Sequence, residues 1–315
     1  MMLDKKNFYI DGKWVTPIEP RSYKVIDPSK EEPCAEISLG GKKDIDKAVS
    51  AAKKAIKTWA FTKKEERLEL LEKLYVIYKK RWVEMAKLIS LEMGAPIDFS
   101  TKMQTAAGAS HIKSFKTILK DFKFEKDLGD ENNNQKLLYE PKGVCALITP
   151  WNWPINQVNL KVIPALASAC TVVLKPSEIA PLSSMLLAEM IDEAKFPTGV
   201  FNLVNGDGTV TGDALTSHPD IDMISFTGST RAGALISQNA AKDFKRISLE
   251  LGGKGANIIF KDADPEAVAR GVLRCFRNSG QSCNAPTRML VEKSIYNKTV
   301  EKVKELANKT KVDSP

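Results

Sequence analysis

Residues 144–154 read VCALITPWNWP, an uncharged apolar run followed by a turn rich in tryptophan and proline. The run at 144–149 has the length of a buried strand, and a helix is expected after Pro154. From here to residue 249, short apolar runs alternate with stretches of helical periodicity; the further runs fall at 171–174, 200–204, 223–226 and 245–249. Buried parallel strands linked by helices explain this alternation, which predicts a doubly wound α/β sheet.

The segment before this alternation is predicted to be mostly helical. Residues 8–15 form a predicted β-hairpin with Asp11-Gly12 at its turn. Apolar residues then recur at helical spacing over 44–59, 64–93 and about 100–120. A polar turn region over 127–135 precedes a predicted strand at 136–140.

After residue 252 the pattern predicts the start of a second α/β lobe. Apolar runs at 257–260 and 289–291 are typical of strands, and helices are expected over 265–277 and 293–311.

Composition and charge argue against several classes of protein. The 47 Lys and Arg residues give a net charge of +8, but they are spread along the chain, whereas nucleic-acid binders concentrate them. Two histidines and five irregularly spaced cysteines favour neither a metal site, nor a Ser-His-Asp triad, nor a disulfide framework. No apolar stretch resembles a signal peptide or a membrane span, so we expect a cytoplasmic protein with no membrane and no nucleic-acid partner.

Residues 226–233 follow a predicted strand and open a helix, a setting that suits a phosphate group. Gly228 permits a tight turn, and Ser229 with the free amides of the helix start can face a pyrophosphate. The spacing is GxxxxG and differs from the usual dinucleotide fingerprint, so an ordinary turn is the alternative. A second glycine cluster at 206–212 is explained at least as well by a turn that caps the next helix.

Lys175-Pro176-Ser177-Glu178 follows another predicted strand. Side chains at the carboxyl end of a parallel strand lie where α/β sheets bind nucleotides. Glu178 can accept hydrogen bonds from ribose hydroxyls and would repel a 2′-phosphate. The alternative is that Ser177 and Glu178 cap the following helix.

Cys283 lies in a polar loop, in the sequence Gly280-Gln281-Ser282-Cys283. A cysteine that only packs is expected in apolar surroundings, as at Cys145 and Cys170, and Cys275 is expected to be buried on its helix. A nucleophilic thiol needs a base or a positive charge nearby, and no histidine is close in sequence.

Glu250, between Leu249 and Leu251, is the candidate base, and a salt bridge with Lys254 is its alternative. Asn152 lies between two tryptophans directly after a predicted strand. A carboxamide held in this way can donate a hydrogen bond to an oxyanion, although Asn152 can also be a helix cap.

These motifs, in this order, are specific together. The chain resembles the aldehyde dehydrogenase superfamily from about Phe8 to its end. The segments that carry the resemblance are Pro150-Trp151-Asn152-Trp153-Pro154, Lys175-Pro176-Ser177-Glu178, Phe226-Thr227-Gly228-Ser229, Leu249-Glu250-Leu251-Gly252-Gly253-Lys254 and Gly280-Gln281-Ser282-Cys283.

The resemblance implies a mechanism residue by residue. Cys283 would attack the aldehyde carbon, while the Asn152 side chain and the Cys283 amide hold the oxyanion. Hydride would pass to NAD, and Glu250 would activate the water that hydrolyses the remaining thioester. Lys161 matches a family lysine near the site, with a supporting role.

The resemblance also assigns the cofactor site. NAD is the expected cofactor because of Glu178, and NADP is possible. The implied cofactor-binding residues are Lys175, Ser177, Glu178, Gly228, Ser229, Gly233 and Leu251.

In domain terms, the resemblance implies an NAD-binding domain over 1–121 and 142–252, an oligomerisation hairpin at 122–141, and the N-terminal part of a catalytic domain at 253–315. Family members are commonly half as long again, so the chain is expected to lack much of its catalytic lobe. A longer form would be a homodimer or homotetramer acting on a small aldehyde. The alternatives are an inactive remnant that at most binds a dinucleotide, and a thioesterase-like or thiol-redox protein that uses Cys283 without hydride transfer.

Overall fold

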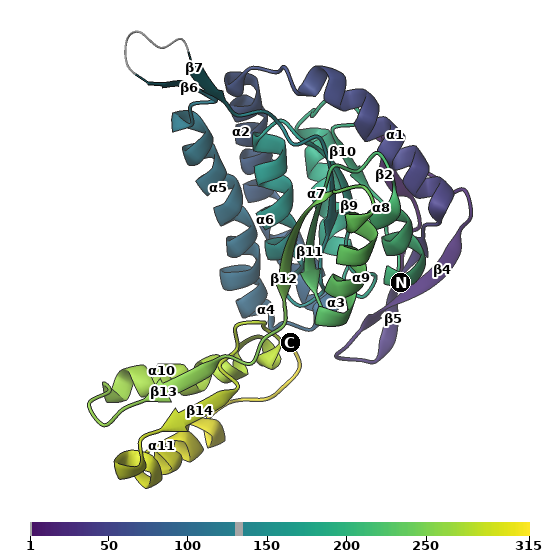
Figure 1. Ribbon diagram of the computed structural model, residues 1–315. Helices are drawn as coiled ribbons and strands as arrows, with labels where there is room; N and C mark the ends of the chain where they lie inside the picture. Colours follow the sequence, from purple (N-terminus) through teal and green to yellow (C-terminus); the bar gives the residue numbers. More distant parts are fainter. Residues whose placement is uncertain (1, 130–134) are drawn as a thin grey trace. The chain divides into compact units, whose positions relative to one another are not determined.

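The computed structural model describes residues 2–129 and 135–315 and divides into two compact units, one up to Glu250 and one from Leu251 to Pro315. The first unit is built on a seven-stranded sheet (Figure 1). Across the sheet its strands are β12 (Arg246–Leu251), β11 (Met223–Gly228), β8 (Val144–Ile148), β9 (Thr171–Lys175), β10 (Phe201–Leu203), β2 (Phe8–Ile10) and β3 (Lys13–Val15). From β8 the strand order continues to β9 and β10 on one side, and the chain then returns to place β11 on the other side of β8. This switch in strand order, between β8 and β11, is a point where α/β folds bind ligands.

The predicted parallel sheet is confirmed in its central strands. β8 pairs in parallel with β9 and β11, and β9 pairs in parallel with β10. All residues of β8, β9 and β10 are buried, as expected for strands covered on both faces. The predicted hairpin is also confirmed, since β2 and β3 pair antiparallel, with Asp11 and Gly12 at positive φ in the turn.

Helices cover both faces of this sheet (Figure 1). One face carries α1 (Lys42–Trp59), α8 (Asp213–Ser217) and α9 (Thr230–Ala241), and the other carries α6 (Pro154–Ala167) and α7 (Leu182–Glu193). Outside α6 and α7 lie α2 (Lys64–Lys80), α3 (Trp82–Met93) and α5 (Thr105–Asp121). Short helical segments complete the unit: α4 (Ile97–Phe99), the π-helical turns η1 (Ser100–Gln104) and η2 (Gly208–Gly212).

The prediction of a single helix over 64–93 is wrong, because the structure has two helices, α2 and α3, in this range. The helix breaks at Arg81, whose φ of −96° and ψ of 19° are not helical. The Arg81 guanidinium donates to Glu84 and to Glu189, at 2.8 and 2.6 Å, so the break is fixed by ion pairs. Both helices present apolar residues to the same layer, which is why the periodicity continues through the break.

A three-stranded sheet near the N-terminus was not predicted. It has the order β1 (Leu3–Lys5), β5 (Glu32–Leu39) and β4 (Arg21–Asp27). In β4 and over residues 34–37 of β5, buried and more exposed residues alternate: Val25 and Asp27 are buried on either side of the exposed Ile26. This period of two was the available signal.

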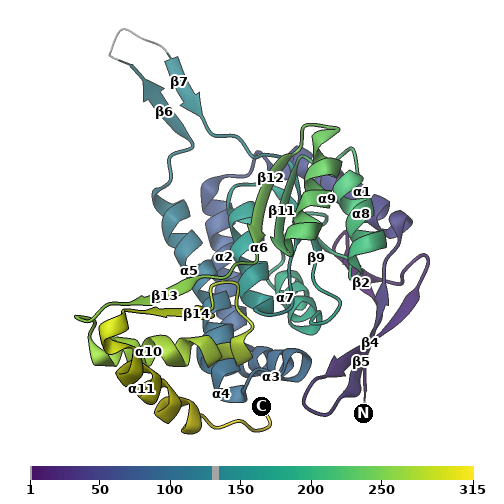
Figure 2. The same ribbon diagram turned by 60° about the horizontal axis from the view of Figure 1, so that its bottom comes forward.

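The hairpin of β6 (Glu125–Leu128) and β7 (Gln135–Leu138) extends away from the helices of the first unit (Figure 2). The two strands pair antiparallel, and all eight of their residues are exposed. Part of the polar turn region expected over 127–135 lies outside the described residues.

The second unit is small. β13 (Ala256–Ile259) pairs in parallel with β14 (Arg288–Val291). α10 (Pro265–Phe276) contacts α11 (Tyr296–Asn308). The 3₁₀ turn η3 (Arg277–Gly280) directly follows α10, and the 3₁₀ turn η4 (Lys293–Ile295) directly precedes α11. α10 begins as predicted, with Pro265 in its first turn and Asp264 accepting hydrogen bonds from two amides.

Candidate functional site

A pocket of about 300 Å³ lies in the first unit, at the carboxyl ends of β8, β9 and β11 and against α8 and α9. It is lined by apolar residues of β8, β11 and α9 and by polar residues that include Lys175, Asp213, Arg231 and Asn239. Of the predicted cofactor residues, Lys175 lines this pocket. Its place beside the switch in strand order is where a nucleotide is expected.

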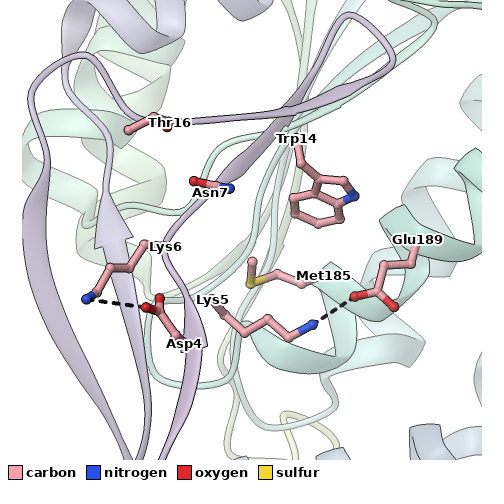
Figure 3. Close-up of a pocket in the computed structure, with 8 residues that line it drawn as sticks. All are labelled: Asp4, Lys5, Lys6, Asn7, Trp14, Thr16, Met185 and Glu189. Atoms are coloured by element: carbon pink, nitrogen blue, oxygen red, sulfur yellow. Dashed lines mark hydrogen bonds and ion pairs between the residues drawn. The ribbon is translucent and has the colours of Figure 1, made fainter.

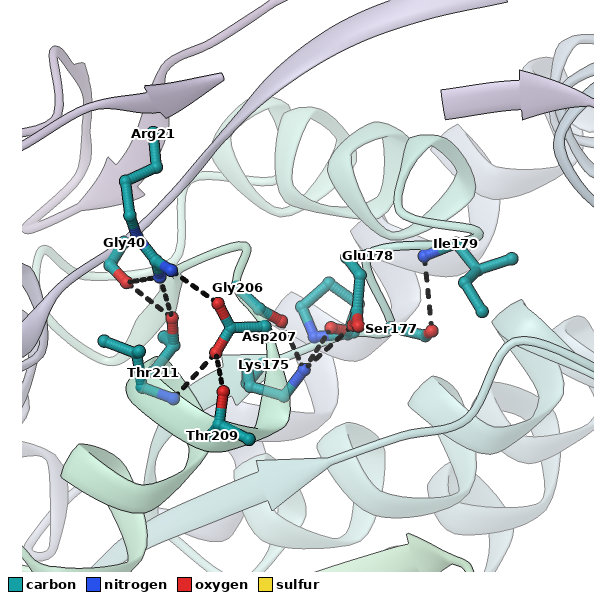
Figure 4. Close-up of polar contacts among 12 residues, drawn as sticks. Arg21, Gly40, Lys175, Ser177, Glu178, Ile179, Gly206, Asp207, Thr209 and Thr211 are labelled. Atoms are coloured by element: carbon teal, nitrogen blue, oxygen red, sulfur yellow. Dashed lines mark hydrogen bonds and ion pairs between the residues drawn. The ribbon is translucent and has the colours of Figure 1, made fainter. Parts of the chain in front are cut away.

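Lys175, the last residue of β9, is held firmly (Figure 4). Its ammonium donates to the carbonyls of Pro176 and Gly206, at 2.9 and 2.6 Å, and lies 3.7 Å from the Glu178 carboxylate. Burial lowers the pKa of Lys175, against the charges of Glu178 and Asp207. The ammonium therefore lies at a fixed point of the pocket wall.

Ser177 and Glu178 lie between β9 and α7. The Ser177 hydroxyl accepts a hydrogen bond of 3.3 Å from the amide of Ile179. Burial, followed by the charge of Glu178, raises the pKa of Tyr23 on β4. The alternative that Ser177 or Glu178 caps the helix is wrong, because α7 begins at Leu182 with Pro181 in the capping position.

Gly228 ends β11 and Ser229 precedes α9. A side-chain carbon at Gly228 would lie 2.4 Å from the Phe226 ring, so a larger residue here would require that ring to move. The Ser229 hydroxyl accepts from the Ala232 amide at 3.2 Å, which makes it the helix cap, and the Gly233 amide donates to the Ser229 carbonyl at 2.9 Å. The N-terminus of a twelve-residue helix therefore lies next to the pocket.

The turn at 206–212 contributes more than the sequence indicated (Figure 4). Asp207 caps the turn as expected, accepting from the Val210 amide at 2.7 Å. It also receives a 2.6 Å hydrogen bond from Arg21 of β4, and Arg21 donates to the Gly40 carbonyl as well. Gly208 lines the pocket. Sequence reasoning missed Arg21 because it lies 186 positions from its partner.

Asn152 lies in the half-buried turn between β8 and α6. Its carbonyl accepts a hydrogen bond of 3.2 Å from the buried Gln104 side chain, which ties the turn to η1. α6 begins at Pro154, and Trp153 takes the position before the helix. Asn152 is therefore not at the capping position that was its alternative.

Lys161 is buried on α6, and its ammonium lies 3.1 Å from the Ser225 hydroxyl on β11. Burial lowers the pKa of Lys161 to about 8, and the charge of Glu250 opposes this shift. Glu250, on β12, is exposed. Adjacent residues of β11 point to opposite faces, so Ser225 meets Lys161 while Phe226 lines the pocket.

Cys283 belongs to the second unit and is exposed. Three successive residues before it, Asn278, Ser279 and Gly280, have positive φ of 55°, 54° and 73°. Positive φ is strained for Ser279, and such strain is concentrated at functional sites. Gly253 lies close, since a side-chain carbon there would be 3.6 Å from the Cys283 carbonyl. Leu251, two residues before Gly253, is half-buried.

The other cysteines have different surroundings. Cys145 and Cys170 are buried, as predicted. The expectation that Cys275 is buried is wrong, because it is half-buried and its thiol donates to the Pro286 carbonyl at 2.6 Å. Cys283 is thus the cysteine most open to a reagent in the described part of the chain.

A second pocket, of about 520 Å³, contains none of the predicted site residues (Figure 3). Lys5 reaches Glu189 across it at 2.9 Å, beside Trp14 and Met185. Over residues 2–129 and 135–315, no group of three or more His, Cys, Asp or Glu side chains is placed to hold a metal ion. None of the helices in those ranges combines the length and apolar character that crossing a bilayer requires.

Comparison with known proteins identifies the family. The family model for the aldehyde dehydrogenase family matches residues 14–315. The chain belongs to the aldehyde dehydrogenase family. Among relatives of this family, it is 52% identical over 292 residues to 3-succinoylsemialdehyde-pyridine dehydrogenase of a Pseudomonas species, covering 92% of this chain and 60% of the relative.

Solved aldehyde dehydrogenases share the fold. An aldehyde dehydrogenase from Bartonella henselae is 60% identical with a TM-score of 0.97, covering 99% of this chain and 66% of that one. A mutant of aldehyde dehydrogenase C from Pseudomonas syringae, in complex with NAD⁺ and octanal, is 46% identical with a TM-score of 0.94, covering 96% and 62%. The chain therefore spans about 60–66% of the length of these family members.

Proposed function

We propose that this chain acts in the oxidation of an aldehyde to a carboxylic acid with NAD⁺, through a covalent adduct on Cys283. The observation that carries the proposal is the exposed Cys283 thiol, three positions after a strained turn at 278–280, in a chain of the aldehyde dehydrogenase family. An exposed, polar setting is typical of a reactive cysteine and not of a packing one.

The residues around the 300 Å³ pocket fit a dinucleotide. The N-terminus of α9, with Gly228, Ser229 and Gly233, offers positive potential to a pyrophosphate. Lys175, Ser177 and Glu178 would bind the adenosine ribose, and Leu251 would also contribute to the site. Bound NAD⁺ would supply the hydride acceptor that allows the Cys283 adduct to become a thioester.

The remaining chemistry is assigned to side chains of this chain. Cys283, as a thiolate, adds to the carbonyl carbon, and the Asn152 carboxamide donates to the resulting oxyanion. Glu250 takes a proton from the water that attacks the thioester, which releases the acid and restores the Cys283 thiolate. Lys161, whose ammonium and the Glu250 charge influence each other, has a supporting role.

Glu178 supports NAD⁺ over NADP⁺. Its carboxylate is about one-quarter exposed and carries the negative charge that a 2′-phosphate would meet. Glu178→Ser should lower the Kd for NADP⁺ relative to NAD⁺ by about tenfold, equivalent to one like-charge contact of about 1.4 kcal/mol. Equal loss of both affinities would contradict this role.

Turnover tests the proposal directly. The 315-residue protein is mixed with NAD⁺ and either octanal or the semialdehyde named by the Pseudomonas relative, and NADH absorbance is followed. We expect turnover that Cys283→Ala abolishes and that Cys275→Ala, a change of a half-buried cysteine in the same unit, leaves unchanged. Wild-type turnover no higher than that of Cys283→Ala would overturn the proposal.

A second candidate function is dinucleotide binding without turnover. It is favoured by the pocket at Lys175, which is lined entirely by residues of the first unit. Calorimetry with NAD⁺ that shows binding, together with no NADH formation, would select this candidate.

Assembly is also proposed. Residues 1–121 and 142–252 would form the cofactor domain, residues 253–315 would begin the catalytic domain, and the hairpin at 122–141 would join subunits into a homodimer or homotetramer. The hairpin supports this, because Leu128 and Leu138 on its two strands, and Tyr139 directly after β7, are exposed by 40% or more. Light scattering that finds a clean monomer would contradict it.

A further inference from the structure

Glu92, near the end of α3, is a carboxylate with almost no access to solvent. It is 1% exposed, and its two oxygens accept hydrogen bonds from the backbone amides of Leu182 and Ser183, at 2.5 and 3.1 Å. Leu182 and Ser183 are the first two residues of α7. A side chain of one helix therefore binds the N-terminus of another, 90 positions further along the chain.

α7 depends on this external acceptor. The first amides of a helix have no partner inside the helix, and a side chain at the capping position normally accepts one of them. Here Pro181 occupies that position, and no side-chain cap is formed. The Glu92 carboxylate takes over this function, and its negative charge also suits the positive end of the helix.

The start of α7 is joined to the cofactor loop. Residues 176–181 connect Lys175, at the end of β9, to Leu182. One end of this short loop is fixed by the Lys175 hydrogen bonds to Pro176 and Gly206, and the other end is fixed by Glu92. Ser177 and Glu178, the residues assigned to the adenosine ribose, lie between these two anchors.

We propose that Glu92 is a positioning residue for the adenosine half of the dinucleotide. From the neighbouring helix α3 it caps the N-terminus of α7, and in this way it fixes the loop that carries Ser177 and Glu178. The inference rests on the proposed cofactor site. Glu92 does not touch the ligand. Its effect passes through the amides of Leu182 and Ser183.

The test measures ADP-ribose binding to the full chain by calorimetry, with Glu92→Gln as the variant. The amide replaces one acceptor with an NH₂ group that faces an N–H donor, so the cap is lost on one side. We expect the Kd to rise about tenfold, as for one lost charged hydrogen bond. Glu193→Gln, which removes an exposed charge at the other end of α7, is the matched control and should leave the Kd unchanged.

A pH profile separates positioning from a loss of stability. Burial raises the pKa of Glu92 to about 7, against the hydrogen bonds from Ser183 and Leu182. The charge of Glu92 also acts on the Cys34 thiol of β5. The pKa of this thiol is raised to about 11, mainly by burial and less by nearby carboxylates. ADP-ribose lacks the phosphate monoester that titrates near pH 6. Wild-type affinity should therefore weaken as the pH falls from about 8 to about 6, and Glu92→Gln should be flat over that range.

The outcomes are distinct. Equal Kd values for wild type and Glu92→Gln, or parallel pH profiles, overturn the role of Glu92. Wild-type protein that does not bind ADP-ribose overturns the cofactor site itself. If Glu92→Gln does not fold, the wild-type profile decides alone, and a flat profile overturns the inference.

Discussion

The two units of this chain bury their apolar residues to very different extents. In the first unit, β8, β9 and β10 are buried at every residue between two helix layers. Among residues 251–315, the buried apolar side chains are those of Ile259, Val272 and Ala285, while Ile258 and Phe260 are about 60% exposed. A sheet covered on both faces gains most from the hydrophobic effect, so the first unit is expected to hold most of the folding free energy.

The largest expected effect comes from the centre of the first sheet. Leu174 on β9 is completely buried, and Leu174→Ala should lower the free energy of unfolding by about 2–5 kcal/mol, since it leaves a cavity. Leu290→Ala in the second unit removes a side chain that is 55% exposed and should cost less than about 1 kcal/mol. Urea unfolding of both variants measures the difference, and similar losses would break the comparison.

Glu92 gives the first unit a stability that depends on pH. Burial makes the folded state favour the neutral carboxyl over the carboxylate that caps α7. Because the folded pKa of about 7 lies above the ordinary 4.5, this contribution to stability is complete below about pH 4.5 and is lost as the pH rises through 7. Wild type should therefore lose about 3 kcal/mol relative to Glu92→Gln between about pH 4.5 and pH 8. Urea titrations at several pH values check this, and a constant difference would show that the carboxylate does not titrate in this range.

The contribution of Lys161 to the free energy of unfolding should change with pH in the opposite direction to that of Glu92. Its pKa of about 8 lies below the ordinary 10.5, so the folded state disfavours the charged form, and stability rises as the pH increases from about 8 to 10.5. Relative to Lys161→Met, wild type should gain about 2 to 3 kcal/mol over that range. The same urea titrations apply, with Lys242→Met on the exposed end of α9 as a control that should show no such trend.

The smallest effect is expected next to Cys283. Ser279 has a positive φ of 54°, which glycine adopts without strain. Ser279→Gly should relieve about 1 kcal/mol of backbone strain, partly offset by the greater freedom of glycine in the unfolded chain. Hydrogen exchange of the second unit would detect the change, and a decrease in protection would argue that this turn is not strained.

The sequence predicts the central strands of the seven-stranded sheet better than the three-stranded sheet of β1, β5 and β4 or the break between α2 and α3. Buried parallel strands are continuous apolar runs, so β8, β9 and β11 are found within a residue or two from composition alone. β4 and β5 have a weaker signal, because one face of each strand is polar and their period of two extends over few residues. The break at Arg81 leaves no mark on the periodicity, since it depends on ion pairs with residues such as Glu189, far along the chain.

The site divides in the same way. The positions of Lys175, Gly228 and Ser229 follow from local motifs, because each lies at a strand end or just before a helix. Arg21 and Glu92 act through partners 186 and 90 positions away, and a single sequence contains no local sign of such contacts. The positive φ at Ser279 is also not predictable, since serine normally avoids it.

The position of β2 in the seven-stranded sheet has a consequence for biosynthesis. β2 is synthesised well before its partner strand β10, since Asp11 bonds to Asn202 and Tyr9 pairs with Leu203, 191 positions or more later. At about 5–20 residues per second, the apolar side chains of Phe8, Tyr9 and Ile10 wait on the order of 10–40 s for their partner strand. A nascent chain of this kind presents a hydrophobic segment to chaperones throughout that interval, and contacts this distant in sequence make folding slow.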